Sequence, residues 1–169
     1  MCYFITVAFP KAMENSILTA LPKGLQPLKF TNQTITNLLP KDYASLAIIT
    51  AMCSCDLYTP AMPGEKERAN EALRRKYVKK GWPENKIQRA LDDHEKNMNV
   101  RREGFRDDFL HWLTTSVANT RQNLFVFVHM YSGQIETAEL EVGRERIKAA
   151  EFGSYQMNFP QDVLVEIKN

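Results

Sequence analysis

Helical periodicity fills the middle of this chain, from Glu65 to Thr120, and strand-like segments lie on both sides of it. The strongest of these segments are Cys2–Phe9 and Ala44–Met52 before the block, and Asn123–Tyr131 and Asp162–Lys168 after it. Strands at both ends of a chain with helices between them are typical of an α+β fold. We therefore expect a single mixed or antiparallel sheet with the helical block (about 65–120) packed on one face.

Two further segments are weaker strand candidates. Leu25–Ile35 is interrupted by Pro27, which favours a position near a sheet edge. Gln134–Val142 follows a hairpin-type turn at Ser132-Gly133 and shows imperfect alternation of apolar and polar residues. By contrast, Asn123–Tyr131 is continuously apolar, as expected of a central strand that is covered on both faces.

Turn-forming residues divide the helical part of the chain. Glu65–Lys80 is expected to form one helix, which Gly81 ends. Pro83 fits the first turn of a second helix, and His94 lies on its apolar stripe, which predicts a buried histidine. A third helix is expected from about Arg101 to Ala118.

The composition is that of an ordinary soluble globular protein. Of 169 residues, 44% are hydrophobic and 25% charged, and the formal net charge is +2. We expect one α+β domain over 1–169, with a helical insertion at 64–120 as the alternative. Three cysteines do not make a disulfide scaffold, the opening segment lacks the pattern of a signal peptide, and no stretch has the apolar length of a membrane span. These features predict a cytoplasmic protein without membrane association.

The cysteines are the residues most suggestive of a chemical site. Cys53 and Cys55 form a Cys-x-Cys pair at the end of one strand-like segment, and Cys2 opens another. If these two strands are antiparallel neighbours, Cys2 lies beside Cys53, and three thiolates could hold zinc. His129, which lies in an apolar strand, is the fourth ligand we select. The other candidates for the fourth position are His94, His111 and Asp56.

The same thiols have other interpretations. Free cysteines are often small buried residues, inert or merely sensitive to oxidation, in which case there is no cofactor. A nucleophilic cysteine would need a base nearby, and the chain has three histidines. Met1-Cys2 resembles the opening of glutamine amidotransferases and abasic-site-crosslinking proteins, in which the exposed cysteine is nucleophile and base. Their glycine-containing continuation is missing here, so we do not expect that activity. The Met-Cys opening and later Cys-x-Cys are also similar to those of bacterial proteins without an assigned activity.

A basic run in the helical part is the candidate docking surface. It could contact an acidic protein or phosphate, although neighbouring acids favour a solvated helix face, and few aromatic residues are available to stack on bases. Its candidate partner-binding residues are Arg74, Arg75, Lys79, Lys80, Lys86 and Arg89.

The chain has no nucleotide-binding or hydrolase motif, so we do not expect an enzyme. Our leading hypothesis is a small cytosolic protein-binding module, for example a bacterial toxin-neutralising immunity protein. The alternative is a thiolate-centred protein that uses Cys2, Cys53 and Cys55 as a zinc site or an enzyme site. Weak nucleic-acid binding through Arg74–Arg89 is a further alternative.

Overall fold

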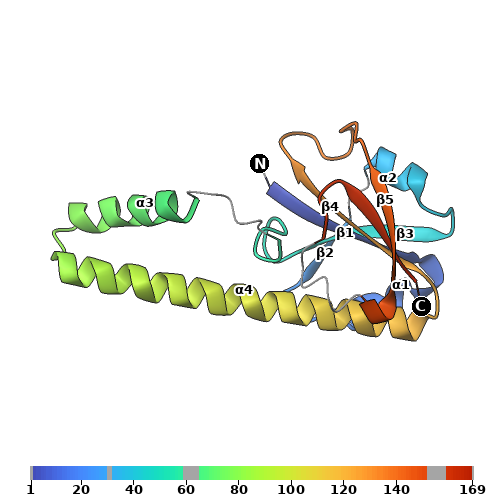
Figure 1. Cartoon of the computed structure of the whole chain (residues 1–169), viewed down its shortest axis with the longest axis horizontal. Helices are drawn as coiled ribbons and strands as arrows, with labels where there is room; N and C mark the ends of the chain where they lie inside the picture. Colours follow the sequence, from blue (N-terminus) through green and yellow to red (C-terminus); the bar gives the residue numbers. More distant parts are fainter. Residues whose placement is uncertain (1, 30–31, 59–64, 152–158, 169) are drawn as a thin grey trace. The chain divides into compact units, whose positions relative to one another are not determined.

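One six-stranded mixed sheet forms the centre of the fold, with the strand order β2-β3-β1-β4-β6-β5 (Figure 1). The computed structural model describes residues 2–29, 32–58, 65–151 and 159–168. All neighbouring strands are antiparallel except β5 and β6, which are parallel. The predicted α+β class is therefore confirmed. The strands are β1 Cys2–Pro10, β2 Gln26–Leu28, β3 Tyr43–Ile49, β4 Leu124–Tyr131, β5 Gly143–Lys148 and β6 Val163–Lys168.

The helices range from single turns to one very long element. α4 alone has 37 residues. None of the helices in the described part of the chain combines the length and the apolar character that a membrane span requires. The helices are η1 Lys11–Met13, α1 Glu14–Thr19, α2 Gln33–Leu38, α3 Glu65–Lys79 and α4 Glu84–Thr120.

The chain divides into two compact units, which we describe separately. The sheet unit consists of Met1–Tyr58 and Phe105–Asn169, and the helical unit is Thr59–Gly104. Because α4 runs through the boundary at 104/105, its residues from Phe105 onward belong to the sheet unit. The helical unit is therefore shorter than the insertion 64–120 that the sequence suggested as an alternative to one domain.

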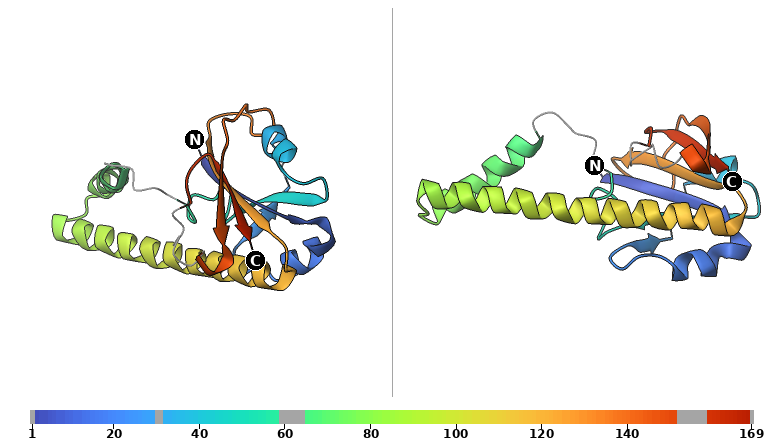
Figure 2. Two further views of the ribbon diagram at one scale, coloured as in Figure 1. Left: turned by 45° about the vertical axis from the view of Figure 1, so that its right-hand side comes forward. Right: turned by 60° about the horizontal axis from the view of Figure 1, so that its bottom comes forward.

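The C-terminal part of α4 covers one face of the sheet, beside α1 (Figures 1 and 2). The Trp112 indole donates a hydrogen bond of 3.0 Å to the Ile17 carbonyl of α1. Gly24, at φ +92°, leaves room for the Phe105 ring, which would lie only 2.8 Å from a Cβ at this position. The principal core lies at this face, and it includes Ile5, Val7 and Phe9 of β1 and Phe109, Trp112, Leu113 and Val117 of α4.

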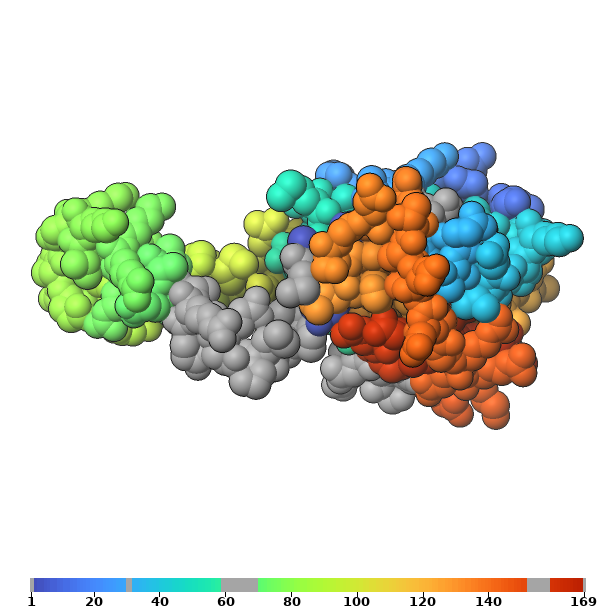
Figure 3. Space-filling view, turned by 90° about the horizontal axis from the view of Figure 1, so that it is seen from above, coloured from blue at the N-terminus to red at the C-terminus, as the bar shows by residue number. Residues whose placement is uncertain are grey.

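The opposite face of the sheet is covered by α2 and by the irregular segment 132–142, which lie side by side (light blue and orange in Figure 3). Asn32 joins the two. Its side-chain amide donates to the carbonyls of Ile135 and Ala138, each at 2.8 Å, and its Oδ1 accepts the N–H of Ile35 as the N-cap of α2. One buried side chain therefore fixes both elements.

Two strand predictions were wrong at this second face. Leu25–Ile35 yields only the short edge strand β2, and Gln33–Ile35 belongs to α2, because Asn32 caps a helix there. Gln134–Val142 is not a strand. The imperfect alternation of Gln134–Val142 reflects an irregular segment that packs Ile135, Ala138 and Leu140 on the sheet while its carbonyls bond to Asn32.

The predicted break near Arg101 was also wrong, because α4 is continuous from Glu84 to Thr120. The stretch contains Gly104 but no proline, and one glycine inside a helix costs only about 1 kcal/mol relative to alanine. The predicted end of α3 is confirmed. Gly81 has φ +71°, and the N–H of Trp82 bonds to the Tyr77 carbonyl in a Schellman arrangement, with the two rings stacked 4.6 Å apart.

Candidate metal centre

The three cysteines converge on one place in the sheet unit. The Sγ atoms of Cys2, Cys53 and Cys55 all lie within 4.8 Å of one another. Each of the three residues is half-buried, and all three thiols are free. Two segments separated by about fifty residues of sequence thus bring every cysteine of the chain together.

Strand pairing explains this convergence. β1 and β3 are antiparallel neighbours, with Ile5 opposite Ile48, so the start of β1 lies beside the end of β3. The loop that leaves β3 then turns back over the start of β1, because the Ser54 N–H donates to the Tyr3 carbonyl at 2.8 Å. The antiparallel pairing on which the sequence argument depended is present, and it places Cys2 beside the Cys-x-Cys pair.

Ser54, between the two loop cysteines, holds the loop in place. Its side chain is fully buried, donates to the Ile48 carbonyl at 2.6 Å and accepts the Ile5 N–H at 2.9 Å. The hydroxyl therefore bridges the two strands where they begin to separate. Because residue 54 is anchored to both β1 and β3, Cys53 and Cys55 on either side of it are positioned by the sheet itself.

The environment of the Cys55 sulfur favours a protonated thiol in the absence of a metal. Burial is the main cause that raises the pKa of the Cys55 thiol to about 12, and a hydrogen bond with Cys53 adds to it. The Tyr3 N–H, 3.4 Å from Cys55 Sγ, acts in the opposite direction because it stabilises a thiolate. An activated nucleophile needs a lowered thiol pKa, so Cys55 does not have that character.

Among the described residues, no histidine or carboxylate side chain adds a ligand atom to the group of three sulfurs. His129, expected as the fourth ligand, is not in this group. Its Nδ1 contacts Asp162 Oδ1, and its ring packs against that of Tyr131 at 4.3 Å. Asp56 accepts a hydrogen bond from the Thr50 hydroxyl at 3.3 Å.

The two remaining histidines are exposed. For His94, the predicted burial was wrong, because the apolar stripe of its helix is only partly covered. His111 belongs to the part of α4 in the sheet unit and lines a small hollow beside α1.

The candidate docking residues lie in the helical unit, and several have partners within it. Arg74 pairs with Glu84, Arg75 with Glu71 at 3.0 Å, and the Lys86 ammonium lies 4.1 Å from the centre of the Trp82 ring. Lys79, Lys80 and Arg89 are exposed. Much of the basic run is thus engaged in local contacts on a solvated surface.

Comparison with protein-family models, with curated proteins and with solved structures finds no match to this chain.

Sequence reasoning identified the sulfurs but missed Ser54. Its role depends on tertiary placement, since a serine between two cysteines has no distinctive pattern. The only signal was its position in the short segment that follows an apolar strand, where a small polar side chain can satisfy backbone groups.

Proposed function

We propose that Cys2, Cys53 and Cys55 bind a soft metal ion, with zinc as the first candidate. The convergence of the three sulfurs within 4.8 Å carries this proposal. Thiolates are the ligands that zinc and other soft ions prefer. The same convergence favours a thiolate-centred protein over the docking module as the primary function.

The spacing of the sulfurs suits such an ion. A zinc–sulfur bond is about 2.3 Å, so two thiolates of a tetrahedral site lie about 3.8 Å apart. Sulfurs already within 4.8 Å need only small side-chain rotations to reach that geometry. The backbone N–H of Tyr3 would remain as a donor to Cys55 and help to stabilise the charge of the bound thiolate.

Such a site would join the start of β1 to the loop that follows β3. Both belong to the sheet unit, and β1 is a central strand of it. A ligand that binds only the folded state stabilises it, by about 2.7 kcal/mol when its concentration is a hundred times its dissociation constant. The proposed role is thus a structural one, with a fourth position left for water or another small ligand.

Elemental analysis of protein purified without chelator tests the proposal. We expect about one zinc per chain and three thiols that react slowly with a thiol reagent until the metal is removed. Cys2→Ser, Cys53→Ser and Cys55→Ser should each lower the metal content. Met52→Ser is the matched control, because Met52 is a sulfur-containing neighbour that is 86% exposed and outside the cluster.

Protein that stays metal-free after incubation with zinc or Cu(I) under reducing conditions would contradict the proposal. A single hyper-reactive thiol would instead support a cysteine-dependent enzyme.

Docking to another protein is a second proposal, and it concerns the helical unit. Val78 and Val100 are large apolar side chains that are 56% and 62% exposed there. Exposed apolar side chains among charged residues suit a protein partner better than a nucleic acid. Capture of a specific protein by the native chain, lost in a Val78→Asp/Val100→Asp double variant, would support it. The nature of the partner, a toxin included, stays a prediction.

A further inference from the structure

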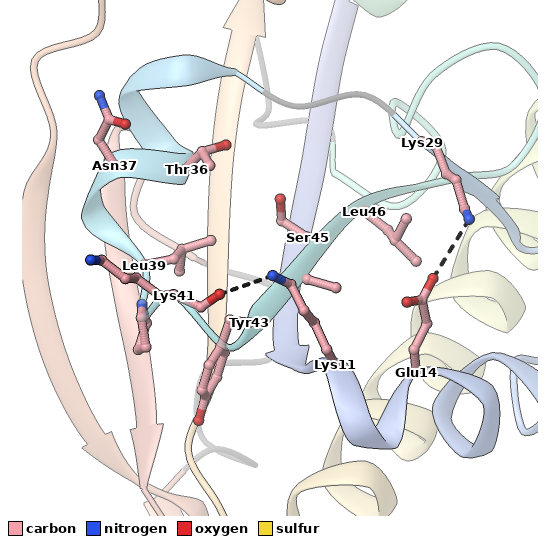
Figure 4. A pocket seen from close by; sticks show the side chains of 12 residues that line it. Lys11, Glu14, Lys29, Thr36, Asn37, Leu39, Lys41, Tyr43, Ser45 and Leu46 are labelled. Atoms are coloured by element: carbon pink, nitrogen blue, oxygen red, sulfur yellow. Dashed lines mark hydrogen bonds and ion pairs between the residues drawn. The ribbon is translucent and has the colours of Figure 1, made fainter.

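A hollow lined by lysines lies at the other end of β3 from the cysteines. It has a volume of about 820 Å³ and is built by η1, α1, the end of β2, α2 and the start of β3 (Figure 4). This size is within the range of small-molecule sites. The hollow belongs entirely to the sheet unit, and its residues do not overlap with the cysteine cluster.

The lining carries more positive than negative charge. Lys11, Lys29 and Lys41 accompany one acid, Glu14, which leaves two more positive than negative charges among the lining residues. This excess of positive charge attracts anions to the hollow.

Lys11 is the cation best placed to bind such an anion. Its Nζ donates a hydrogen bond of 2.9 Å to the Lys41 carbonyl, and this bond holds the ammonium over β3 (Figure 4). An ammonium group has three N–H donors, so two remain for a ligand. Lys29 is held at one side by Glu14, with 3.7 Å between Nζ and Oε1.

The rest of the lining indicates what kind of anion fits. Ser45, in β3, contributes a hydroxyl that can donate to an anionic oxygen. Leu39, Pro40 and Leu46 add apolar surface beside the charged groups. Two excess positive charges match a phosphate dianion, and the apolar residues match an organic group attached to it.

We propose that this hollow binds a small organic phosphate, with Lys11 as the principal contact to the phosphate group. Lys29 and Lys41 supply further positive charge at the rim, and Ser45 supplies a hydroxyl donor. The hollow is thus a second ligand site of the sheet unit, independent of the metal centre.

The test is a titration of the full chain with inorganic phosphate and with phenyl phosphate, followed by amide shifts in ¹H–¹⁵N spectra at constant ionic strength. We expect shifts at residues 36–46, and tighter binding of phenyl phosphate because its ring contacts the apolar residues. Lys11→Gln should weaken binding roughly tenfold or more, since hydrogen bonds between charged groups are strong. Glu14→Gln should tighten binding, because it removes a negative charge and releases Lys29.

Lys96→Gln is the matched control, because Lys96 lies outside the basic run of candidate docking residues. It removes the same charge from an exposed position of the helical unit and should leave both affinities within about twofold. Equal losses in Lys11→Gln and Lys96→Gln would overturn the proposal, as would unchanged binding in Lys11→Gln or the absence of shifts at residues 36–46. A response to a phosphotyrosine peptide without one to phenyl phosphate would overturn it as well, because the site would then serve a protein partner.

Discussion

Strand β3 leads to a different candidate site at each of its ends. At its start, Tyr43–Leu46 lines an open hollow where three exposed lysines outnumber one acid, Glu14. Beyond its end, the loop carries Cys53 and Cys55, which are half-buried, and burial raises the pKa of the Cys55 thiol. Hard, hydrated cations and soft, desolvated sulfurs select different ligands. One strand can thus position two candidate sites of different ligand chemistry when different loops cover its two ends.

A buried polar side chain fixes the surroundings of each site. Ser54 joins the cysteine loop to β1 and β3, and Asn32 joins α2, which lines the lysine hollow, to the segment 132–142. Variants of these two residues therefore test whether the two ends of β3 are independent.

Ser54→Ala should have the largest effect. It deprives the Ile5 N–H and the Ile48 carbonyl of their partner in a fully buried position, which costs roughly 2–4 kcal/mol of unfolding free energy. Metal affinity should fall with it, because Cys53 and Cys55 lose their anchor. Urea unfolding and metal content measure the two effects. Unchanged stability would show that the hydroxyl bridge is not needed.

Asn32→Ala should have a smaller effect at the other end. It removes the N-cap of α2, worth about 1 kcal/mol, and leaves two part-buried carbonyls without their donor. We expect a loss of roughly 1–3 kcal/mol. Phenyl phosphate binding should weaken and metal content should stay the same. Loss of metal in this variant would mean that the two ends are coupled.

Alkaline pH should weaken the metal-free protein. Burial raises the pKa of Cys55 from 9.0, and that of Tyr131 from 10.0, to about 12 in each case. Above pH 9 to 10 the unfolded chain loses these protons while the folded chain keeps them, so the free energy of unfolding falls as pH rises. Urea unfolding at pH 8 and at pH 10.5 measures this change. Cys55→Ser should show a smaller fall, and equal falls would contradict the assignment to Cys55.

The smallest expected effects are those of a substitution at one site on ligand binding at the other site. Cys53→Ser should leave phenyl phosphate affinity unchanged, and Lys11→Gln should leave metal content unchanged, since distant sites without shared partners act additively. Parallel binding measurements on both variants provide the check. A change above about threefold in either direction would reject independence.

The two ends of β3 also differ in how far the sequence predicted them. Cysteine is rare in this chain, and the apolar segments that became β1 and β3 were recognisable. The meeting of Cys2 with Cys53 could therefore be stated as the consequence of an antiparallel pairing, but the pairing itself could not be predicted. Lysine is common, and only the fold brings Lys11, Lys29 and Lys41 to one hollow. The helix α2 and the irregular segment after Gly133 were also missed, because both depend on the tertiary contacts of Asn32.

X-ray absorption at the zinc edge of the reconstituted protein tests the metal centre most directly. We predict three sulfur neighbours at about 2.3 Å, with the sulfur contribution reduced in Cys2→Ser and unchanged in Met52→Ser. A first shell of nitrogen and oxygen alone would contradict the account.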